Sequence, residues 1–190
     1  MRIAFVDVET TGLDPERDEI IEVCVETWDD GATAGPSYAE RFMPRGECGE
    51  GAARVNGFTF EKWAGSPFFT AEHAHKIAAV LEYVAQAGGC IGGAAVAFDR
   101  AFLTKAFERV RVPFPKISHR LIDVQSMAVP LLVTEQIRGV SLGDLQDYFG
   151  LGAVEHTAVG DVHNTIKVFE GLLEVLCPGL MIAPAAAGVV

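Results

Sequence analysis

Two carboxylates stand two residues apart in an apolar stretch near the start of the chain. The stretch Arg2–Gly12 reads RIAFVDVETTG, where Asp7 and Glu9 interrupt a run of β-branched and aromatic residues. In a β-strand such residues leave the same face, about 6–7 Å apart along the strand. Like charges flanked by core residues repel each other and lose hydration unless something positive lies between them. The spacing is therefore consistent with a divalent metal site, or with a strand that ends near Val8 and leaves both acids solvated.

Three further polar residues stand near expected element boundaries. Asp99 follows Phe98 where a strand should pass into a helix. Asp161 is expected to begin the last helix, and His156 precedes it by five residues in a glycine-containing loop. Each has an ordinary structural explanation, because an acid near a helix N-terminus gains about 0.3–1 kcal/mol and histidines are common in surface loops. Their joint placement at one end of a sheet favours a shared site instead.

Length and composition indicate the class of protein that would carry such a site. The chain has 190 residues, 49% of them hydrophobic and 22% charged, which suits an ordinary globular protein. We expect one domain over residues 1–177 and an apolar tail over residues 178–190. Two acids among the first ten residues argue against a signal peptide, and no apolar run approaches the roughly 20 residues of a membrane span. The four scattered cysteines lack a C-x-x-C pair, which favours reduced thiols and a cytoplasmic location.

The net charge of −11 argues against a protein that coats nucleic acid, which should be basic. It is compatible with an enzyme that contacts nucleic acid through metal ions. Such an enzyme should hold only a short stretch of substrate, because it lacks the lysines for an extended phosphate track.

The order of expected elements predicts an α/β fold. Three strands come first. One lies within residues 2–12 and has Asp7 and Glu9 near its end, and the others span residues 20–28 and 37–43. The second alternates so that it should be half-buried. A glycine-rich strand over residues 89–96 should be central and closely approached by another segment. Helices and one further strand account for the rest, with helices expected over residues 71–87, 98–110, 141–149 and 161–176 and the strand over residues 120–124. Strands first and βα alternation afterwards indicate a mixed sheet.

Three motifs together are similar to a known family. They are DVETTG at residues 7–12, AFDRAFL at residues 97–103 and HTAVGD at residues 156–161. Their order and separation resemble those of the DEDDh (DnaQ-like) 3′→5′ exonucleases, a superfamily that includes polymerase proofreading subunits, RNase T-like enzymes and oligoribonucleases. The resemblance implies an RNase H-like fold: a mixed five-stranded sheet, three meander strands and then βα units, flanked by helices.

The resemblance also implies roles for particular residues. Two Mg²⁺ or Mn²⁺ ions would be held by Asp7, Glu9, Asp99 and Asp161, and oxygen ligands suit these hard cations. His156 would be the general base, for which an ordinary imidazole pKa of about 6.5 is suitable. The segment Thr10, Thr11, Gly12 and Leu13 would bind the terminal nucleotide, with backbone and hydroxyl groups of the first three and an apolar wedge from Leu13.

The implied function is phosphodiester hydrolysis at 3′ ends of single-stranded nucleic acid, releasing nucleoside 5′-monophosphates. DNA is slightly favoured, on the resemblance to proofreading domains. The alternatives are an exoribonuclease that trims short RNA and an inactive subunit of a polymerase or nuclease complex; a polymerase or a second copy of the chain would be its protein partner. One departure concerns substrate placement: the family often has His-Asn before the Phe-Asp pair, whereas this chain has Ala94-Ala95.

Overall fold

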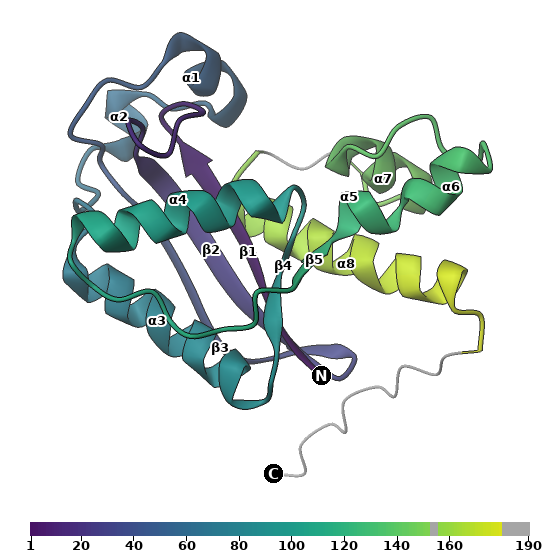
Figure 1. Cartoon of the computed structure of the whole chain (residues 1–190). Coiled ribbons are helices and arrows are strands. Elements are labelled where there is room, and N and C mark those ends of the chain that lie inside the picture. Colours follow the sequence, from purple (N-terminus) through teal and green to yellow (C-terminus); the bar gives the residue numbers. More distant parts are fainter. Residues whose placement is uncertain (153–155, 180–190) are drawn as a thin grey trace, which may run out of the picture.

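A mixed β-sheet forms the centre of the molecule in the computed structural model, which describes residues 1–152 and 156–179. Its five strands lie in the order β3-β2-β1-β4-β5 (Figure 1). The first three pair antiparallel, and β4 and β5 run parallel to β1. The predicted meander followed by βα units is therefore confirmed. The strands are β1 (Arg2–Thr10), β2 (Ile20–Asp29), β3 (Ala32–Arg41), β4 (Cys90–Gly93) and β5 (Leu121–Asp123).

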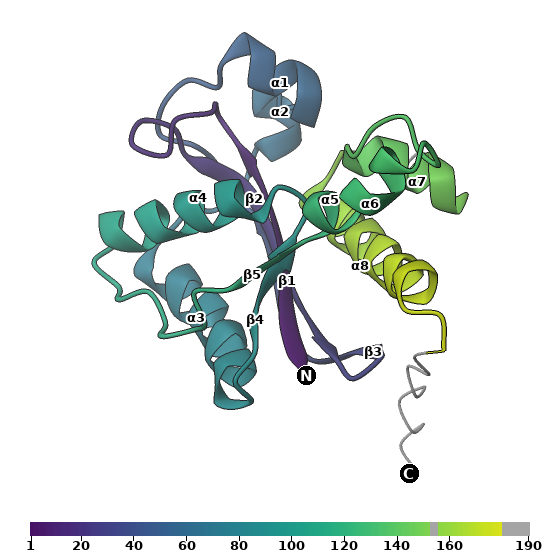
Figure 2. The ribbon, with the colours of Figure 1, turned by 45° about the vertical axis from the view of Figure 1, so that its right-hand side comes forward.

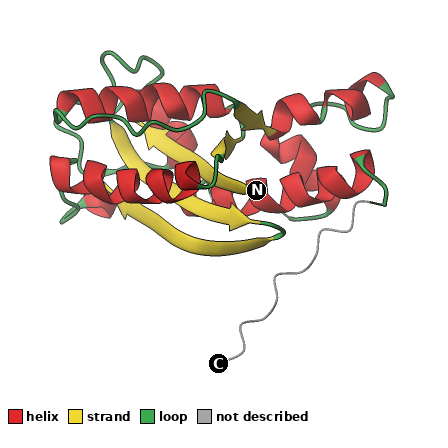
Figure 3. Cartoon of the chain, turned by 60° about the horizontal axis from the view of Figure 1, so that its bottom comes forward, coloured by secondary structure: helices red, strands yellow, loops and turns green. Residues whose placement is uncertain are grey.

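Helices cover both faces of this sheet. One face packs against α3 and α4, and the other against the group from α5 to α8 (Figures 2 and 3). The helices are α1 (Glu50–Asn56), α2 (Phe60–Trp63), α3 (Ala71–Gln86), α4 (Val96–Arg109), α5 (Val124–Met127), α6 (Val129–Val133), α7 (Leu142–Phe149) and α8 (Ala158–Leu176). Within the described residues, no helix combines the length and the apolar character that a membrane crossing requires.

The expectation that the second strand is half-buried is wrong. Both faces of β2 are buried, because α8 covers the face that alternation assigned to solvent. Trp28 on that face packs edge-on against Phe169 of α8, with ring centroids 5.3 Å apart. Cys24 lies on the same face, and its pKa is raised to about 12, chiefly by burial of the thiol. The thiol therefore stays protonated and unreactive at neutral pH.

Several element boundaries differ from the sequence-based expectation. The third strand begins at Ala32, earlier than residue 37, and tolerates Pro36 because β3 is an edge strand. The last helix begins at Ala158, so Asp161 completes its first turn instead of starting it. Thr157 caps this helix, its hydroxyl accepting a hydrogen bond from the N–H of Gly160. Of the expected apolar tail, residues 180–190 lie outside the described residues.

The glycine-rich strand is shorter than expected, and its glycines show what approaches it. β4 spans four residues, and α4 begins at Val96. A Cβ added at Gly92 would lie 2.7 Å from the Ile3 side chain, and one at Gly93 would lie 2.9 Å from the carbonyl oxygen of Val6. The close neighbour is therefore β1, which carries the first two acids.

Ala95 connects β4 to α4 in an unfavourable backbone conformation. Its φ is 58° and its ψ is 35°, in the left-handed region that costs an alanine about 1–2 kcal/mol and that asparagine tolerates better. We expect Ala95→Asn to raise the free energy of unfolding by about 0.5–1 kcal/mol in urea titrations. The control, Ala79→Asn on the exposed surface in the middle of α3, should lower it by about 0.5 kcal/mol, since asparagine is unfavourable in helix interiors. Equal effects at the two positions would show that Ala95 carries no strain.

Candidate active site

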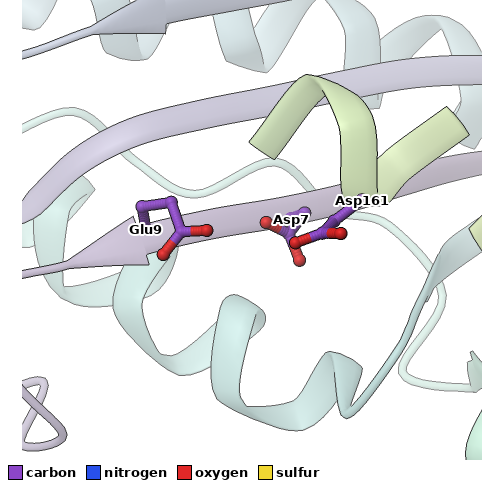
Figure 4. A group of neighbouring side chains, drawn as sticks. All are labelled: Asp7, Glu9 and Asp161. Atoms are coloured by element: carbon purple, nitrogen blue, oxygen red, sulfur yellow. The ribbon is translucent and has the colours of Figure 1, made fainter. Parts of the chain in front are cut away.

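Three carboxylates from two distant segments meet at the end of β1. Asp7 and Glu9 come from this strand and Asp161 comes from the first turn of α8. One carboxylate oxygen of each lies within 4.8 Å of the others. Figure 4 shows Asp161 pointing down from its helix toward Asp7, with Glu9 farther along the strand. The predicted convergence of the early acids with the last aspartate is present.

Strand register and helix packing explain this convergence. Residues at odd positions of β1 face α8, as Phe5 does, whose ring centroid lies 5.2 Å from that of Phe169. Asp7 and Glu9 continue the same face toward the end of the strand. Two turns separate Asp161 from Phe169 along α8. Packing of Phe169 on Phe5 therefore places Asp161 above the two acids.

Asp99 reaches the same strand from the other side of the sheet. The pairing of β4 with β1 ends at Phe5, so the later N–H groups along that edge of β1 have no strand partner. A carboxylate oxygen of Asp99 accepts the Val8 N–H at 3.0 Å, and the residue is only 3% exposed. Asp99 is not one of the three mutually close carboxylates, but it contacts β1 between Asp7 and Glu9.

The pKa of each of these acids is raised, chiefly by burial. Burial raises the pKa of Asp7 well above its usual range, and the charges of Asp99 and Asp161 add to the shift. Burial also raises the pKa of Glu9 to about 7, with Asp161 contributing. The pKa of Asp99 rises through burial, against the hydrogen bond from Val8. For Asp161, burial raises the pKa and His156 opposes it. Ionising all of these carboxylates would therefore crowd negative charge here, which is the condition that a bound cation relieves.

The donor set suits a hard divalent cation. The mutually close group contains only carboxylate oxygens, which Mg²⁺ and Mn²⁺ prefer, and no sulfur or imidazole of the kind that zinc selects. Burial and repulsion between carboxylates raise the pKa of Asp7 and of Glu9, and a bound cation would offset both effects. Asp7, Glu9 and Asp161 thus fit a metal centre.

The crowding predicts how pH affects the stability of the metal-free protein. The pKa of Glu9 is about 7 in the folded protein, against an ordinary value of 4.5. The folded state therefore binds more protons in this range, and the free energy of unfolding falls as pH rises from 4.5 through about 7. We expect the Tm measured in EDTA to fall over this pH range and saturating Mn²⁺ to remove most of that fall. The difference in Tm between the Mn²⁺ and EDTA samples should therefore widen as pH rises. A difference that stays constant from about pH 5 to about pH 8 would contradict a cation site at these acids.

His156 lies beside the carboxylates but outside their group. Its Nδ1 is 3.9 Å from a carboxylate oxygen of Asp161, and 68% of the side chain is exposed. It stands directly before the residue that caps α8, so the helix start fixes its distance from Asp161. An exposed imidazole beside the acids can approach a substrate without displacing a carboxylate, as a general base must.

A pocket of about 610 Å³ opens next to Glu9. The four residues predicted to bind the terminal nucleotide, Thr10 to Leu13, line one side of it. Residues of α1 and the preceding loop line the other side, and Phe98 of α4 closes it. Leu13 is 84% exposed, as an apolar wedge should be before a base covers it.

The two threonines differ from the expectation in one respect. Their side chains are buried, and the Thr10 hydroxyl donates to the carbonyl of Gly12 at 2.6 Å. The Thr11 hydroxyl accepts from the N–H of Glu19 at 2.9 Å. Both hydroxyls thus fix the shape of the loop, which favours contact with a nucleotide through backbone groups instead.

Sequence reasoning did not identify two polar residues that support the site. Glu22 of β2 pairs in register with Glu9, is 5% exposed and forms a 3.1 Å ion pair with Arg41. The alternation of β2 predicts the correct face for the Glu22 side chain. That face was expected to be exposed to solvent, so the sequence did not indicate that Glu22 is buried beside Glu9. Asn56 is also buried, and its side-chain amide donates to the carbonyl of Thr10 at 2.9 Å. This bond attaches the end of α1 to the pocket loop.

Comparison with known proteins supports the reading of the geometry. A family model described as "Exonuclease" (RNase T) matches residues 4–169, which include every acid of the site. The chain belongs to this exonuclease family. Its members are divalent-metal-dependent nucleases of the DEDDh (DnaQ-like) superfamily, so the resemblance seen in the sequence is confirmed. An oligoribonuclease of Tropheryma whipplei (strain Twist) is 31% identical over 137 residues, covering 66% of this chain and 70% of that protein.

Solved structures show the same fold. E. coli exonuclease I in complex with a dT13 oligonucleotide superposes with a TM-score of 0.76 at 22% identity, over 91% of this chain and 41% of that one. Exonuclease I of Methylocaldum szegediense matches with a TM-score of 0.74 at 22% identity, over 94% and 41%. The RNase H-like architecture is thereby confirmed. This chain spans about two fifths of the length of the exonuclease I chains.

Proposed function

We propose that the chain is a metal-dependent 3′→5′ exonuclease that removes nucleoside 5′-monophosphates from single-stranded ends. The observation that carries the proposal is the approach of Asp7, Glu9 and Asp161 to within 4.8 Å beside an open pocket. The activity is assigned to one domain of residues 1–177. The four free cysteines fit a cytoplasmic enzyme.

In this proposal each residue has one task. Asp7, Glu9, Asp99 and Asp161 would hold two Mg²⁺ or Mn²⁺ ions, which supply Lewis-acid activation and charge stabilisation for phosphodiester hydrolysis. His156 takes a proton from the attacking water at its imidazole. The loop from Thr10 to Gly12 holds the terminal nucleotide through backbone groups. Leu13 packs against its base and separates it from the next one.

A second candidate has a specific observation in its favour. A relative that is 31% identical to this chain is an oligoribonuclease, which favours short RNA over DNA as the substrate. An inactive subunit of a polymerase or nuclease complex is disfavoured, because all four acids and His156 are present around one site.

The deciding experiment digests DNA and RNA strands of equal sequence, labelled at either end, with Mg²⁺ or with EDTA. We expect a 3′ label to be released at once as a mononucleotide and a 5′ label to yield a ladder, in Mg²⁺ only. Comparison of the two sugars at equal length separates the DNA and RNA readings. Absence of hydrolysis of both strands would sink the proposal and favour the inactive subunit.

A further inference from the structure

Basic residues are concentrated in one short segment of this acidic chain. Residues 100–120 contain six of the fifteen lysines and arginines and a single acid, Glu108, whereas the whole chain carries a net charge of −11. The six are Arg100, Lys105, Arg109, Arg111, Lys116 and Arg120, here named the basic strip. So uneven a distribution is not what a uniformly solvated surface requires.

Two residues of the basic strip make contacts within the protein. Lys105 lies 2.8 Å from both Glu16 and Glu108, and Arg109 donates to the carbonyls of Pro15 and Asp18. These contacts hold the loop that carries Leu13 against α4. Among residues 1–152 and 156–179, the other four members of the strip have no acid within ion-pair distance, and three of them (Arg111, Lys116 and Arg120) are exposed.

Two residues of the basic strip, Arg100 and Lys105, line a groove beside α4. It has a volume of about 380 Å³ and is lined on the α4 side by Ala97, Arg100, Ala101, Thr104 and Lys105, and across from it by Pro15 and Leu121. Arg100 donates to the carbonyl of His119 at 3.3 Å, and Arg120, the next residue along the chain, is exposed. The segment after α4 runs back toward β5 in front of the sheet, as Figure 1 shows.

The groove and the pocket are lined by residues that are close together in the sequence. Phe98 lines the pocket while its neighbour Ala97 lines the groove, and Leu13 lines the pocket while Pro15 lines the groove. A strand with its 3′ nucleotide in the pocket therefore has a hollow with cationic side chains directly across the first turn of α4. A single strand carries a negative phosphate at every nucleotide, so this hollow matches its backbone.

We propose that the groove, with Arg100 and Arg120, binds the phosphates of the strand upstream of the 3′ end. The inference rests on the proposed exonuclease function and specifies its substrate as strands longer than a dinucleotide. It also revises the expectation drawn from net charge, since Arg100 and Lys105 line a groove next to the nucleotide pocket.

The test compares the double variant Arg100→Gln/Arg120→Gln with a charge-matched control, Lys76→Gln/Lys167→Gln, on α3 and α8. Binding of a fluorescent oligo(dT) or oligo(U) strand of about twenty nucleotides is measured against salt, with Asp7→Asn added so that the strand is not consumed. Losing two phosphate contacts should reduce the slope of log K against log salt by about 1.4. The ratio of the parent's affinity to that of the double variant should then fall about sevenfold between 50 and 200 mM salt. The control should keep the parental slope.

Two further arms separate the explanations. Arg100→Lys/Arg120→Lys should restore the parental slope, because counterion release depends only on the positive charge. If the guanidinium groups were needed for structure, lysine would not restore it. With Asp7 intact, kcat/KM of the Gln variant should fall on the long strand and stay within twofold on a dinucleotide. Equal losses on both substrates, or an unchanged slope, would overturn the proposal. So would binding of a glutamate-rich peptide that depends on these arginines while strand binding does not. Lack of hydrolysis by the parent enzyme would instead refute the exonuclease function.

Discussion

Asp7→Asn is expected to lower kcat by about a thousandfold or more on any strand that the wild-type protein degrades. Asp7 is the one acid whose pKa is raised by all three of the others, so it stands at the centre of the group. Replacing its carboxylate by an amide removes a charged ligand and several kcal/mol of transition-state stabilisation, and each 1.4 kcal/mol is about tenfold in rate. Single-turnover digestion of an end-labelled strand measures the loss.

The fold should survive this change. The amide has the shape of the carboxylate, and removing one of four crowded charges relieves repulsion, so Tm in EDTA should rise slightly. Asp147→Asn on the exposed surface of α7 is the matched control and should digest the strand at the wild-type rate. Digestion by Asp7→Asn within tenfold of that control would remove Asp7 from the catalytic centre.

His156→Ala is expected to slow the chemical step by about 10²- to 10⁴-fold, the usual contribution of a general base. Because its imidazole lies outside the three-carboxylate group, Mn²⁺ affinity measured by calorimetry should stay within twofold of wild type. Single-turnover rates taken on the same samples separate the two effects.

His75→Ala provides the control for removal of a histidine, since His75 is exposed on α3. Added imidazole should partly restore the rate of His156→Ala and leave the His75 variant unchanged. An unaltered single-turnover rate for His156→Ala would exclude it as the base, and a large loss of Mn²⁺ affinity would assign it to the metal site instead.

The sequence predicted the order of strands along the chain and the closeness of Asp7 to Glu9. The period-two spacing of Asp7 and Glu9 is a local property of a strand, and the meander followed by βα units is set by the order of apolar segments. Placing Asp161 with them needed the resemblance to a family as well. Nothing in local spacing indicates that packing of Phe169 on Phe5 brings the first turn of α8 over β1.

Other features depend on contacts that no local pattern encodes. The second strand alternates like a half-exposed one, yet α8 covers its polar face and buries Glu22 beside Glu9. The start of α8 at Ala158 depends on the Thr157 cap, which was not recognised. Ala95 takes a left-handed conformation at the turn from β4 into α4, a position that local residue type does not reveal because alanine rarely adopts it.

Calorimetric titration with Mn²⁺ tests the central claim most directly, because it reads the metal site without requiring a substrate. Wild-type protein and Asp147→Asn are expected to bind about two ions with the same affinity. Asp7→Asn and Asp161→Asn should each lose at least one of these ions or bind it more than tenfold more weakly. Titration curves for Asp7→Asn and Asp161→Asn that match the wild-type curve, or a wild-type protein that binds no Mn²⁺, would contradict a metal centre built from these carboxylates.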